Sequence, residues 1–367
     1  MAGRRFKTAE KAFLFADAHI KSRLWTNYPK IQGDSYEALK VVQEKADGQN
    51  VISCGDLFDS NRPSSMDLKV VSDFLKHVKR FYYVNGNHDD AIPDIVSSLG
   101  ANTVHLNDTP IFIGEVPFFG IDYCNTKEEL VSKLAHIGDI IREYSSTPVL
   151  IMHQALDVFF MHYTITRKEI EELLQHSCNI FVGDIHVPKK FIGYHNDFSG
   201  LTECCVSPGP LVPQDIGQAK NHNQFFLELT CNERRLDRID DVHIKVRDYF
   251  FLEDPKGLDN TVKEALQSDK KLPPVIFIKT DTEFKVPKEY ANRDDIIIVT
   301  DTTPKELQKE ACTSSSVSLL DAVLEEIQET EPELAKLMSP LVTKLMQSEQ
   351  PDELLLSLIK KWNIILA

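Results

Sequence analysis

Residues 81–90, FYYVNGNHDD, decide the fold of this chain. The first four are aromatic or apolar, which is typical of a buried strand, and Asn85 with Gly86 then predicts a sharp turn. Four polar residues arrive together at the end of that strand: Asn87, His88, Asp89 and Asp90. An amide, an imidazole and two carboxylates are costly to bury this close together without a positive partner. The alternative is a polar turn with Asp90 capping the next helix, and the stretch alone leaves both interpretations open.

Two earlier apolar segments end in the same way. Residues 12–16 run into Asp17 and His19, and residues 50–54 run into Asp56. Between these segments, apolar residues recur at helical spacing in two stretches, 35–47 and 64–80. The order strand, helix, strand, helix, strand predicts parallel βαβ units, in which polar residues just past the strands converge on one edge of the sheet.

Short apolar runs predict further strands, and longer periodic stretches predict further helices. The predicted strands are 103–106, 111–113, 117–121, 148–152 and 180–182, followed by a meander of 191–194, 203–207 and 225–229. The predicted helices are 127–144 and 167–176. One of these strands ends on His153, and another is followed by Asp184 and His186. Polar residues therefore lie at the ends of two more predicted strands.

A change of composition at 231–241 predicts a domain boundary. We expect a first domain over 1–235, a small α/β domain over 236–312 and a helical segment over 313–367. The elements expected in the second domain are strands at 243–251, 274–280 and 295–300 and a helix at 257–268. Residues 354–366 are unusually apolar for the end of a chain, which predicts docking onto the protein itself or onto a partner.

The composition is that of a globular protein without a membrane-spanning segment. The 367 residues are 42% hydrophobic and 26% charged. No run approaches the roughly 18 apolar residues that a span requires. Seven cysteines without a CxxC pair predict reduced thiols in a cytoplasm and disfavour zinc bound by thiolates. With a net charge of −15 and no basic arm, contact with DNA has to rely on bound metal ions, a local patch or a partner subunit.

Eight polar side chains follow the predicted strand ends. They are Asp17, His19, Asp56, Asn87, His88, His153, Asp184 and His186. Any one of the histidines alone is more often a hydrogen-bonded structural residue than a ligand. Together, oxygen and imidazole ligands suit Mn²⁺, Fe or Zn²⁺, and a carboxylate such as Asp56 can bridge two ions. Two ions about 3.5–4 Å apart clamp a phosphate and activate water, so phosphate-ester hydrolysis is the expected reaction class.

Five blocks of this sequence resemble the motifs of the calcineurin-like metallophosphoesterase superfamily. They are DAH (17–19), GDLFD (55–59), GNHD (86–89), His153 and GDIH (183–186). The longer stretch GDLFDSNRPS (55–64), with the order of domains, resembles the SbcD-type nuclease subunits of double-strand-break repair, and the layout is similar to that of a phage-type member. The resemblance implies an α/β fold, a two-sheet sandwich flanked by helices, with a capping domain for DNA recognition and C-terminal helices.

The resemblance also implies a role for each residue. The first metal ion would be held by Asp17, His19, Asp56 and His186. The second would be held by Asn87, His153 and Asp184, with Asp56 as the bridge. His88 would act at the scissile phosphate as general acid or transition-state stabiliser, and Asp89 would orient it. The implied cofactors are two Mn²⁺ ions, with Mg²⁺ as the alternative.

One residue departs from the family pattern. The last motif usually reads Gly-His-x-His, and this chain has Asp184 at the first histidine position. A carboxylate is an acceptable ligand for Mn²⁺ or Mg²⁺ and adds negative charge, so we expect an active site with an altered metal preference.

The resemblance implies a metal-dependent DNA exonuclease or endonuclease acting in recombination, repair or DNA degradation. Its partner would be an SMC-like ABC ATPase (SbcC-type) bound by 313–367, with a nuclease homodimer inside a heterotetramer. The expected location is the cytoplasm, that of the host for a phage protein. Arg62, Lys189 and Lys190 are candidate DNA contacts, with solvated surface charge as the alternative. Two other functions stay open: a phosphatase or cyclic-nucleotide phosphodiesterase of the same superfamily, and a non-catalytic scaffold that organises the ATPase.

Overall fold

The first sheet confirms the parallel βαβ order predicted from the N-terminal sequence. Its strands run in the order β12-β11-β1-β2-β3-β4. They are β1 (Glu10–Phe15), β2 (Asn50–Ser53), β3 (Arg80–Tyr83), β4 (Thr103–His105), β11 (Gln224–Asn232) and β12 (Arg235–Ile244). The four strands from β1 to β4 are parallel, and β11 is antiparallel to both β1 and β12. The carboxyl ends of β1, β2 and β3 therefore meet at one edge of this sheet.

The computed structural model describes residues 9–89, 95–159, 163–194, 201–221, 223–232, 234–280 and 284–302. One unit of the chain comprises 1–252, 256–277 and 287–299, and the second comprises 253–255, 278–286 and 300–367. The helical segment predicted over 313–367 lies outside the described residues. None of the helices in the described part is both long and apolar enough to span a bilayer.

A second six-stranded sheet has the order β5-β6-β7-β8-β10-β9. Its strands are β5 (Ile111–Ile113), β6 (Val116–Ile121), β7 (Val149–His153), β8 (Asn179–Gly183), β9 (Lys189–Tyr194) and β10 (Leu201–Ser207). The central strands β6, β7, β8 and β10 are parallel, and β5 and β9 are antiparallel edge strands. The carboxyl ends of β7 and β8 carry His153 and the GDIH motif to one edge of this sheet.

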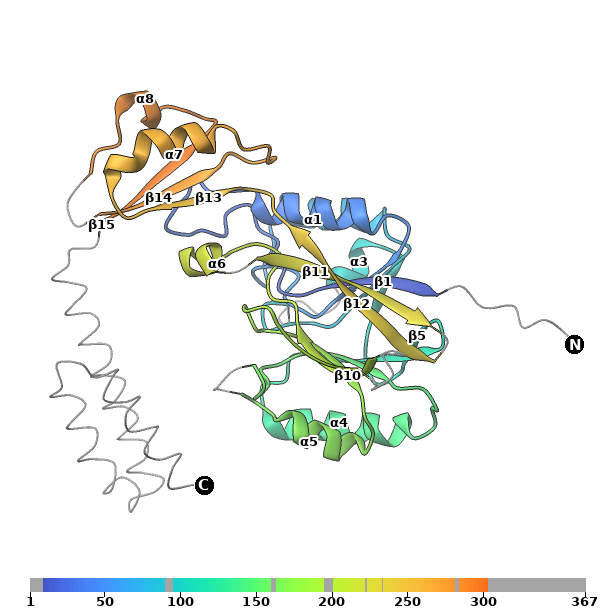
Figure 1. Cartoon of the computed structure of the whole chain (residues 1–367). Coiled ribbons are helices and arrows are strands. Elements are labelled where there is room, and N and C mark those ends of the chain that lie inside the picture. Colours follow the sequence, from blue (N-terminus) through green and yellow to red (C-terminus); the bar gives the residue numbers. More distant parts are fainter. Residues whose placement is uncertain are drawn as a thin grey trace, which may run out of the picture. The chain divides into compact units, whose positions relative to one another are not determined.

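Helices cover the outer face of each sheet (Figure 1). The first sheet carries α1 (Asp34–Lys45), α2 (Ser65–Leu75) and α3 (Ile95–Leu99); the second carries α4 (Lys127–Ile141) and α5 (Arg167–Leu174). A short helix α6 (Ile216–Asn221) precedes β11. Ser64 and Thr166 start α2 and α5 with capping boxes that satisfy the first backbone N–H groups. The predicted sandwich flanked by helices is confirmed.

The inner faces of the two sheets meet in one apolar cluster. Leu14 and Ile52 from the first sheet pack with Phe118, Ile151 and Phe181 from the second, and all five are 0% exposed. The outer faces of the same strands pack against the helices, so the central strands are buried on both sides. This explains why they read in the sequence as continuous apolar runs instead of alternating patterns.

The predicted meander of three strands is wrong. β9 and β10 form a hairpin in the second sheet, whereas β11 lies in the first sheet between β1 and β12. The register places Leu227 opposite Leu14. Apolar patterning predicts that a segment is a strand, but the partner of β11 is an N-terminal strand far away in the sequence.

The sequence also misplaces two element ends. The strand predicted over 243–251 is the end of β12 and a separate strand, β13 (Tyr249–Leu252), and the boundary predicted near residue 235 falls inside the β11–β12 hairpin. The helix predicted through residue 80 ends at Leu75, because the N–H groups of Lys76 and His77 bond to carbonyls only three residues back. The predicted division into domains stays a prediction.

A third sheet has the order β13-β14-β15, with β14 (Val275–Thr280) and β15 (Ile297–Thr302). The helical pieces beside it in the sequence are η1 (Pro255–Gly257), α7 (Leu258–Ala265) and α8 (Lys288–Ala291). Trp25, from the loop after β1, stacks on Phe277 at 5.6 Å and lies 5.9 Å from the Tyr249 ring. The loop that follows the first polar motif is therefore held by aromatic contacts.

A buried ion pair fixes the start of α1 to the segment that leads into β13. Arg247 Nε donates to Asp34 Oδ1 at 2.8 Å, and Nη2 donates to Oδ2 at 3.0 Å. The same Nη2 donates to the Gln32 carbonyl at 2.9 Å, and the Tyr249 hydroxyl donates to Asp34 Oδ1 at 3.0 Å. Arg247 and Asp34 are 2% and 3% exposed, so the carboxylate balances a guanidinium that is almost fully buried.

We expect Asp34→Ala to lower the free energy of unfolding by about 3–5 kcal/mol, because it leaves a buried charge unpaired. The double variant Asp34→Leu/Arg247→Met should recover most of this loss, since neither charge is then buried. Urea unfolding followed by circular dichroism measures both effects. Lys76→Ala, which breaks an exposed ion pair with Asp73, is the control and should unfold like the wild type. Equal stability of Asp34→Ala and the wild type would contradict this account.

Candidate metal centre

The polar residues leave their strands in an unusual backbone conformation. Asp17, His19 and Asp56 have φ values of 47°, 42° and 48°, and φ of Asp184 is 73°. This left-handed region is uncommon for residues other than glycine and costs of order 1–3 kcal/mol per residue. Among the other non-glycine residues described, only Gln175, at the end of α5, shares it. Backbone strain is therefore concentrated at the strand ends that carry the polar set.

Backbone contacts hold the first of these strand ends together. The N–H of Asp17 donates to the Gly55 carbonyl at 3.2 Å, and the N–H of His19 donates to the Asp56 carbonyl at 3.0 Å. The third strand end approaches so closely that a Cβ on Gly86 would lie 2.0 Å from Asp56 Oδ1. The glycine of the GNHD motif is thus required by close approach to the central carboxylate.

Asp17, His19 and His186 form a first group of donor atoms. The Nε2 atoms of His19 and His186 lie 3.3 Å apart, and His186 Nε2 lies 3.6 Å from Asp17 Oδ1. Asp56 Oδ2 lies 3.7 Å from His19 Nε2. Asp17 and His19 are 0% and 2% exposed, whereas the His186 side chain is 33% exposed, so the group opens to solvent on the side of His186.

Asp56, His153 and Asn87 form a second group. His153 Nδ1 lies 2.8 Å from the Cys54 carbonyl oxygen, which only accepts, so Nδ1 carries a proton. His153 Nε2 then faces Asp56 Oδ2 at 3.4 Å and Asn87 Oδ1 at 3.2 Å. Lone pairs that face one another in this way repel unless a proton or a metal cation lies among them.

The ionisation of the buried pair follows from this geometry. Burial alone would lower the pKa of His153, but the hydrogen bond and charge of Asp56, with the charge of Asp17, raise it to about 10. Burial alone would raise the pKa of Asp56, but His153 and His19 lower it to about 2. In the absence of metal, a proton on His153 balances Asp56 at neutral pH. A divalent cation bound there would displace that proton.

The Asp17 carboxylate also indicates a cation. Its Oδ1 accepts the N–H of Asp184 at 2.9 Å, whereas Oδ2 is buried without a hydrogen-bond partner in the described part of the protein. A buried anionic oxygen without a partner is unfavourable, and a cation held with His19 and His186 would satisfy it. Carboxylate, imidazole and amide donors without thiolates fit Mn²⁺, Fe²⁺ or Zn²⁺. Asp56 faces both groups, at 3.7 Å from His19 Nε2 and 3.4 Å from His153 Nε2.

His88 lies at the same edge, with its ring held by a carbonyl. His88 Nδ1 is 2.7 Å from the Asp59 carbonyl oxygen and therefore donates to it, while the backbone N–H of His88 donates to Asp56 Oδ1 at 3.0 Å. His88 and His19 meet edge to face with ring centroids 5.0 Å apart. His19, Asp56 and His88 each offer a donor atom within 4.8 Å of the other two.

In the described part of the protein, the partners of the Asp89 carboxylate are backbone groups and not the His88 ring, and the predicted role of Asp89 in orienting His88 stays a prediction. The Asp89 carboxylate accepts backbone N–H groups of Leu57 at 3.0 Å, Phe58 at 3.1 Å and Gly86 at 3.2 Å. It therefore ties the GDLFD turn to the GNHD turn. Burial and the charge of Asp56 raise the pKa of Asp89 to about 6 despite these three donors. The two residues are neighbours in the sequence, and both contact the GDLFD turn, but through different atoms: Asp89 accepts backbone N–H groups, and His88 donates to the Asp59 carbonyl.

A comparison with known families identifies the group to which this centre belongs. The family model described as calcineurin-like phosphoesterase matches residues 11–212, which is more than half of the chain. That range contains every residue of the centre, from Asp17 to His186. The chain belongs to the calcineurin-like phosphoesterase family.

Within this family, the chain is similar to archaeal proteins named DNA double-strand break repair protein Mre11. It is 27% identical over 207 residues to the protein of Methanosarcina acetivorans, covering 51% of this chain and 33% of the relative. It is 23% identical over 221 residues to the protein of Sulfurisphaera tokodaii, covering 55% of this chain and 54% of the relative. The matches thus span about a third to about half of the length of these relatives. The resemblance predicted from GDLFDSNRPS agrees with them.

In this calcineurin-like phosphoesterase, Asp184 lies beside the donor groups. Its donor atoms are not part of a cluster within 4.8 Å among the described residues, and its N–H is bonded to Asp17. Burial raises the pKa of Asp184; the charges of Asp17 and Asp56 add to this rise, and those of His153 and His186 oppose it. The predicted role of Asp184 as a ligand therefore stays a prediction.

Asp59 is a residue of this phosphoesterase site to which the sequence analysis gave no role. Its carbonyl holds His88, its Oδ1 lies 3.5 Å from His19 Nδ1, and its Oδ2 lies 2.5 Å from Lys21 Nζ. Burial alone would raise the pKa of Asp59, but His19 and Lys21 lower it, so the carboxylate stays ionised. The sequence did contain a signal for Asp59, because it is the last residue of the GDLFD motif.

Asp122 supports the GNHD turn from the second sheet. Asp122 Oδ1 accepts the Asn85 N–H at 2.6 Å and lies 2.8 Å from His105 Nε2. The N–H of Tyr123 donates to the Asn85 carbonyl at 2.9 Å. The sequence gives no local signal for this contact, because Asp122 follows β6 and Asn85 follows β3 in the other sheet.

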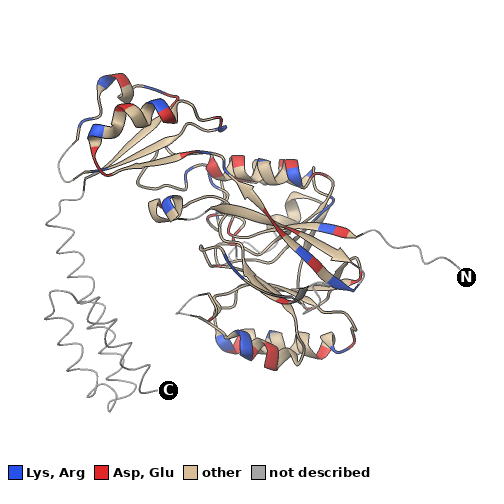
Figure 2. Ribbon diagram, in the orientation of Figure 1, with Lys and Arg blue, Asp and Glu red and all other residues tan. Residues whose placement is uncertain are grey.

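The three predicted DNA contacts differ in their surroundings. Lys189 Nζ donates to the Phe159 carbonyl at 2.8 Å, the Lys190 ammonium pairs with Asp241 above the Phe225 ring, and Arg62 is exposed. Basic and acidic residues alternate over the described ribbon (Figure 2). Lys190 is balanced by Asp241, whereas Arg62 and Lys189 are both exposed cations.

We expect Mn²⁺ at 100 times its dissociation constant to raise the free energy of unfolding by about 2.7 kcal/mol, because the ion binds only the folded centre. Asp56→Ala should abolish most of this gain, since both donor groups lose a carboxylate that they share. Thermal unfolding with Mn²⁺ and with EDTA measures the difference. Asp73→Ala, on an exposed position of α2, is the matched control and should keep the full effect. An undiminished Mn²⁺ effect in Asp56→Ala would remove Asp56 from the centre.

Proposed function

We propose that this chain is a metal-dependent DNA phosphodiesterase, an exonuclease or endonuclease that works with two Mn²⁺ ions. The observation that carries the proposal is the convergence of two donor groups on the buried Asp56, with His88 beside them. Phosphodiester hydrolysis needs positive charge on both sides of a phosphate and a nearby proton donor, and this arrangement has places for both.

The two ions would be held by the groups described above. One would lie among Asp17, His19 and His186, the other among Asn87 and His153, with Asp56 between them. When bound, divalent cations supply Lewis acidity and make water a stronger acid near neutral pH. The protein fixes the donors beforehand through the strained strand ends and through the Cys54 carbonyl that orients His153.

The role of His88 follows from its fixed tautomer. Because Nδ1–H donates to the Asp59 carbonyl, Nε2 is the nitrogen that exchanges a proton with the substrate. In the imidazolium form, Nε2–H can donate to the leaving oxygen of the phosphodiester. The Asp59 carbonyl stabilises that form by accepting from Nδ1.

Support for DNA as the substrate comes from the relatives, which are named for double-strand break repair. We propose that this chain likewise acts in recombination, repair or DNA degradation in the cytoplasm. We further propose that it works as a homodimer with an SMC-like ABC ATPase, which would lend DNA affinity to a chain of net charge −15. The predicted ATPase-binding segment lies outside the described residues.

With Mn²⁺, the purified chain should cleave linear duplex DNA, alone or with the ATPase. His88→Ala should lower kcat about 100-fold or more, because a proton donor is lost while Mn²⁺ binding is kept. Gel assays of DNA cleavage and calorimetric Mn²⁺ titration measure the two effects. His136→Ala, an exposed histidine paired with Asp108, is the matched control and should cleave normally.

Two other outcomes would replace the proposal. Intact DNA together with hydrolysis of p-nitrophenyl phosphate or a cyclic nucleotide would make the chain a phosphatase or cyclic-nucleotide phosphodiesterase. No hydrolysis and no metal binding would make it a scaffold for the ATPase, a reading to which the substitution at Asp184 lends some support.

We also propose that Asp184 ligates the second ion and makes the centre favour Mn²⁺ or Mg²⁺ over Zn²⁺. A hard carboxylate oxygen suits the harder cations, whereas imidazole suits Zn²⁺. Asp184→His should therefore shift the ratio of Mn²⁺ to Zn²⁺ dissociation constants toward Zn²⁺ by about tenfold or more. Calorimetry of Asp184→His and Asp184→Ala measures this. Full two-ion binding by Asp184→Ala would remove Asp184 from the ligand set.

A further inference from the structure

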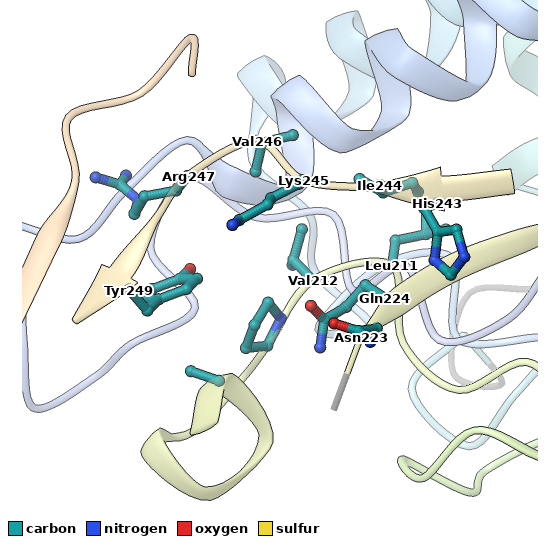
Figure 3. A pocket seen from close by; sticks show the side chains of 12 residues that line it. Leu211, Val212, Asn223, Gln224, His243, Ile244, Lys245, Val246, Arg247 and Tyr249 are labelled. Atoms are coloured by element: carbon teal, nitrogen blue, oxygen red, sulfur yellow. The ribbon is translucent and has the colours of Figure 1, made fainter. Parts of the chain in front are cut away.

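One cavity of the described structure combines useful size with a lining of neutral and basic side chains. It has a volume of about 410 Å³ and is lined by 211–213, 223–224 and 243–247 with Ala219 and Tyr249 (Figure 3). This volume lies within the roughly 300–1,000 Å³ of small-molecule sites. Its described lining contains no aspartate or glutamate, although the chain as a whole has a net charge of −15. The cavity therefore suits an anionic ligand.

One wall of the cavity is an extended segment with alternating side chains. Ile244 and Val246 are 4% and 5% exposed and pack into the core beneath the first sheet. His243 and Lys245, which alternate with them, are exposed, as expected for extended backbone. Figure 3 shows the Lys245 side chain extending between Tyr249 and Val212.

Lys245 is the cation of this wall that has donors to spare. Its Nζ lies 2.6 Å from Asp248 Oδ1. This partly exposed ion pair occupies one of the three N–H groups of the ammonium and leaves two for a ligand. Arg247, in contrast, is committed to Asp34, Gln32 and Pro273 and serves to anchor the segment. Asn223 and Gln224 add amide groups from the start of β11 on the other side.

The strand register relates this cavity to the metal centre. Leu14 of β1 pairs with Leu227 of antiparallel β11, and Ala16, the residue before Asp17, forms a bridge with Pro210, which directly precedes Leu211 of the cavity lining. Gln224 of β11 pairs in turn with Ile244 of β12. At about 4.8 Å per strand, the cavity wall is about 10 Å from the strand that carries Asp17.

We propose that this cavity binds a nucleotide of the DNA strand whose scissile bond lies at the metal centre. The Lys245 ammonium and the amides of Asn223 and Gln224 contact its phosphodiester oxygens. The inference rests on the proposed function, and it adds a site on the protein that holds the DNA strand through the sugar-phosphate backbone of the DNA. Contacts of this kind position a strand without reading its sequence.

The test measures binding separately from cleavage. A fluorescein-labelled single-stranded oligonucleotide is titrated with the full chain carrying His88→Ala and Mn²⁺, with anisotropy as the readout at several salt concentrations. Adding Lys245→Ala should weaken binding about five- to tenfold and reduce the slope of log K against log salt by about 0.7. Lys245→Arg should restore binding. Lys76→Ala, which breaks an exposed ion pair of the same i, i+3 spacing, is the matched control and should bind normally.

Each outcome decides one point. In the otherwise wild-type chain, Lys245→Ala should raise KM for DNA and leave kcat within about twofold, as expected for loss of uniform binding. Lys245→Ala that binds like Lys76→Ala, with an unchanged salt slope, overturns the subsite even if the wild type cleaves DNA. A Lys245 effect on binding without any cleavage by the wild type keeps the subsite and removes the phosphodiesterase function. Tight binding of a free mononucleotide at Lys245 that does not compete with the oligonucleotide also overturns the proposal.

Discussion

Repulsion among buried lone pairs around Asp56 is the constraint on which the site depends. Asp56 is 2% exposed and faces the Nε2 atoms of both His19 and His153. Without metal, a proton on His153 balances this charge, and a divalent cation would do so more completely. The surrounding structure keeps these donors together against their repulsion. It does so with left-handed backbone at three strand ends and with a glycine, Gly86, where no side chain fits.

The two sheets supply different halves of the centre. Asp17, Asp56 and Asn87 follow strands of the first sheet, whereas His153 and His186 follow strands of the second. The apolar layer between the sheets fixes the distance between these strand ends, since it is built from fully buried side chains such as Phe118 and Phe181. Cross-sheet contacts, such as that of the Cys54 carbonyl with His153, then align the two halves to within hydrogen-bond distance.

Carboxylates and cations are distributed differently in the metal centre and in the cavity lined by 211–213, 223–224 and 243–247. The centre concentrates carboxylates in the interior, where cations would neutralise them, whereas the described lining of the cavity has no carboxylate and carries Lys245, which pairs with Asp248. Lys245 is presented there because Ile244 and Val246 are buried and Arg247 is locked to Asp34.

The sequence by itself determined the parallel strand order and which polar residues come at the ends of the strands. Both are local: a strand with two buried faces is an apolar run, and the residues that follow it are its neighbours in the chain. Only the tertiary structure decided what depends on distant contacts. In it, β11 pairs with β1, and the Asp89 carboxylate accepts hydrogen bonds from the backbone N–H groups of Leu57 and Phe58. The Asp59 carbonyl accepts a hydrogen bond from the His88 ring. A residue's position in the chain specifies its strand end, but the direction of its side chain is specified by partners from other strands.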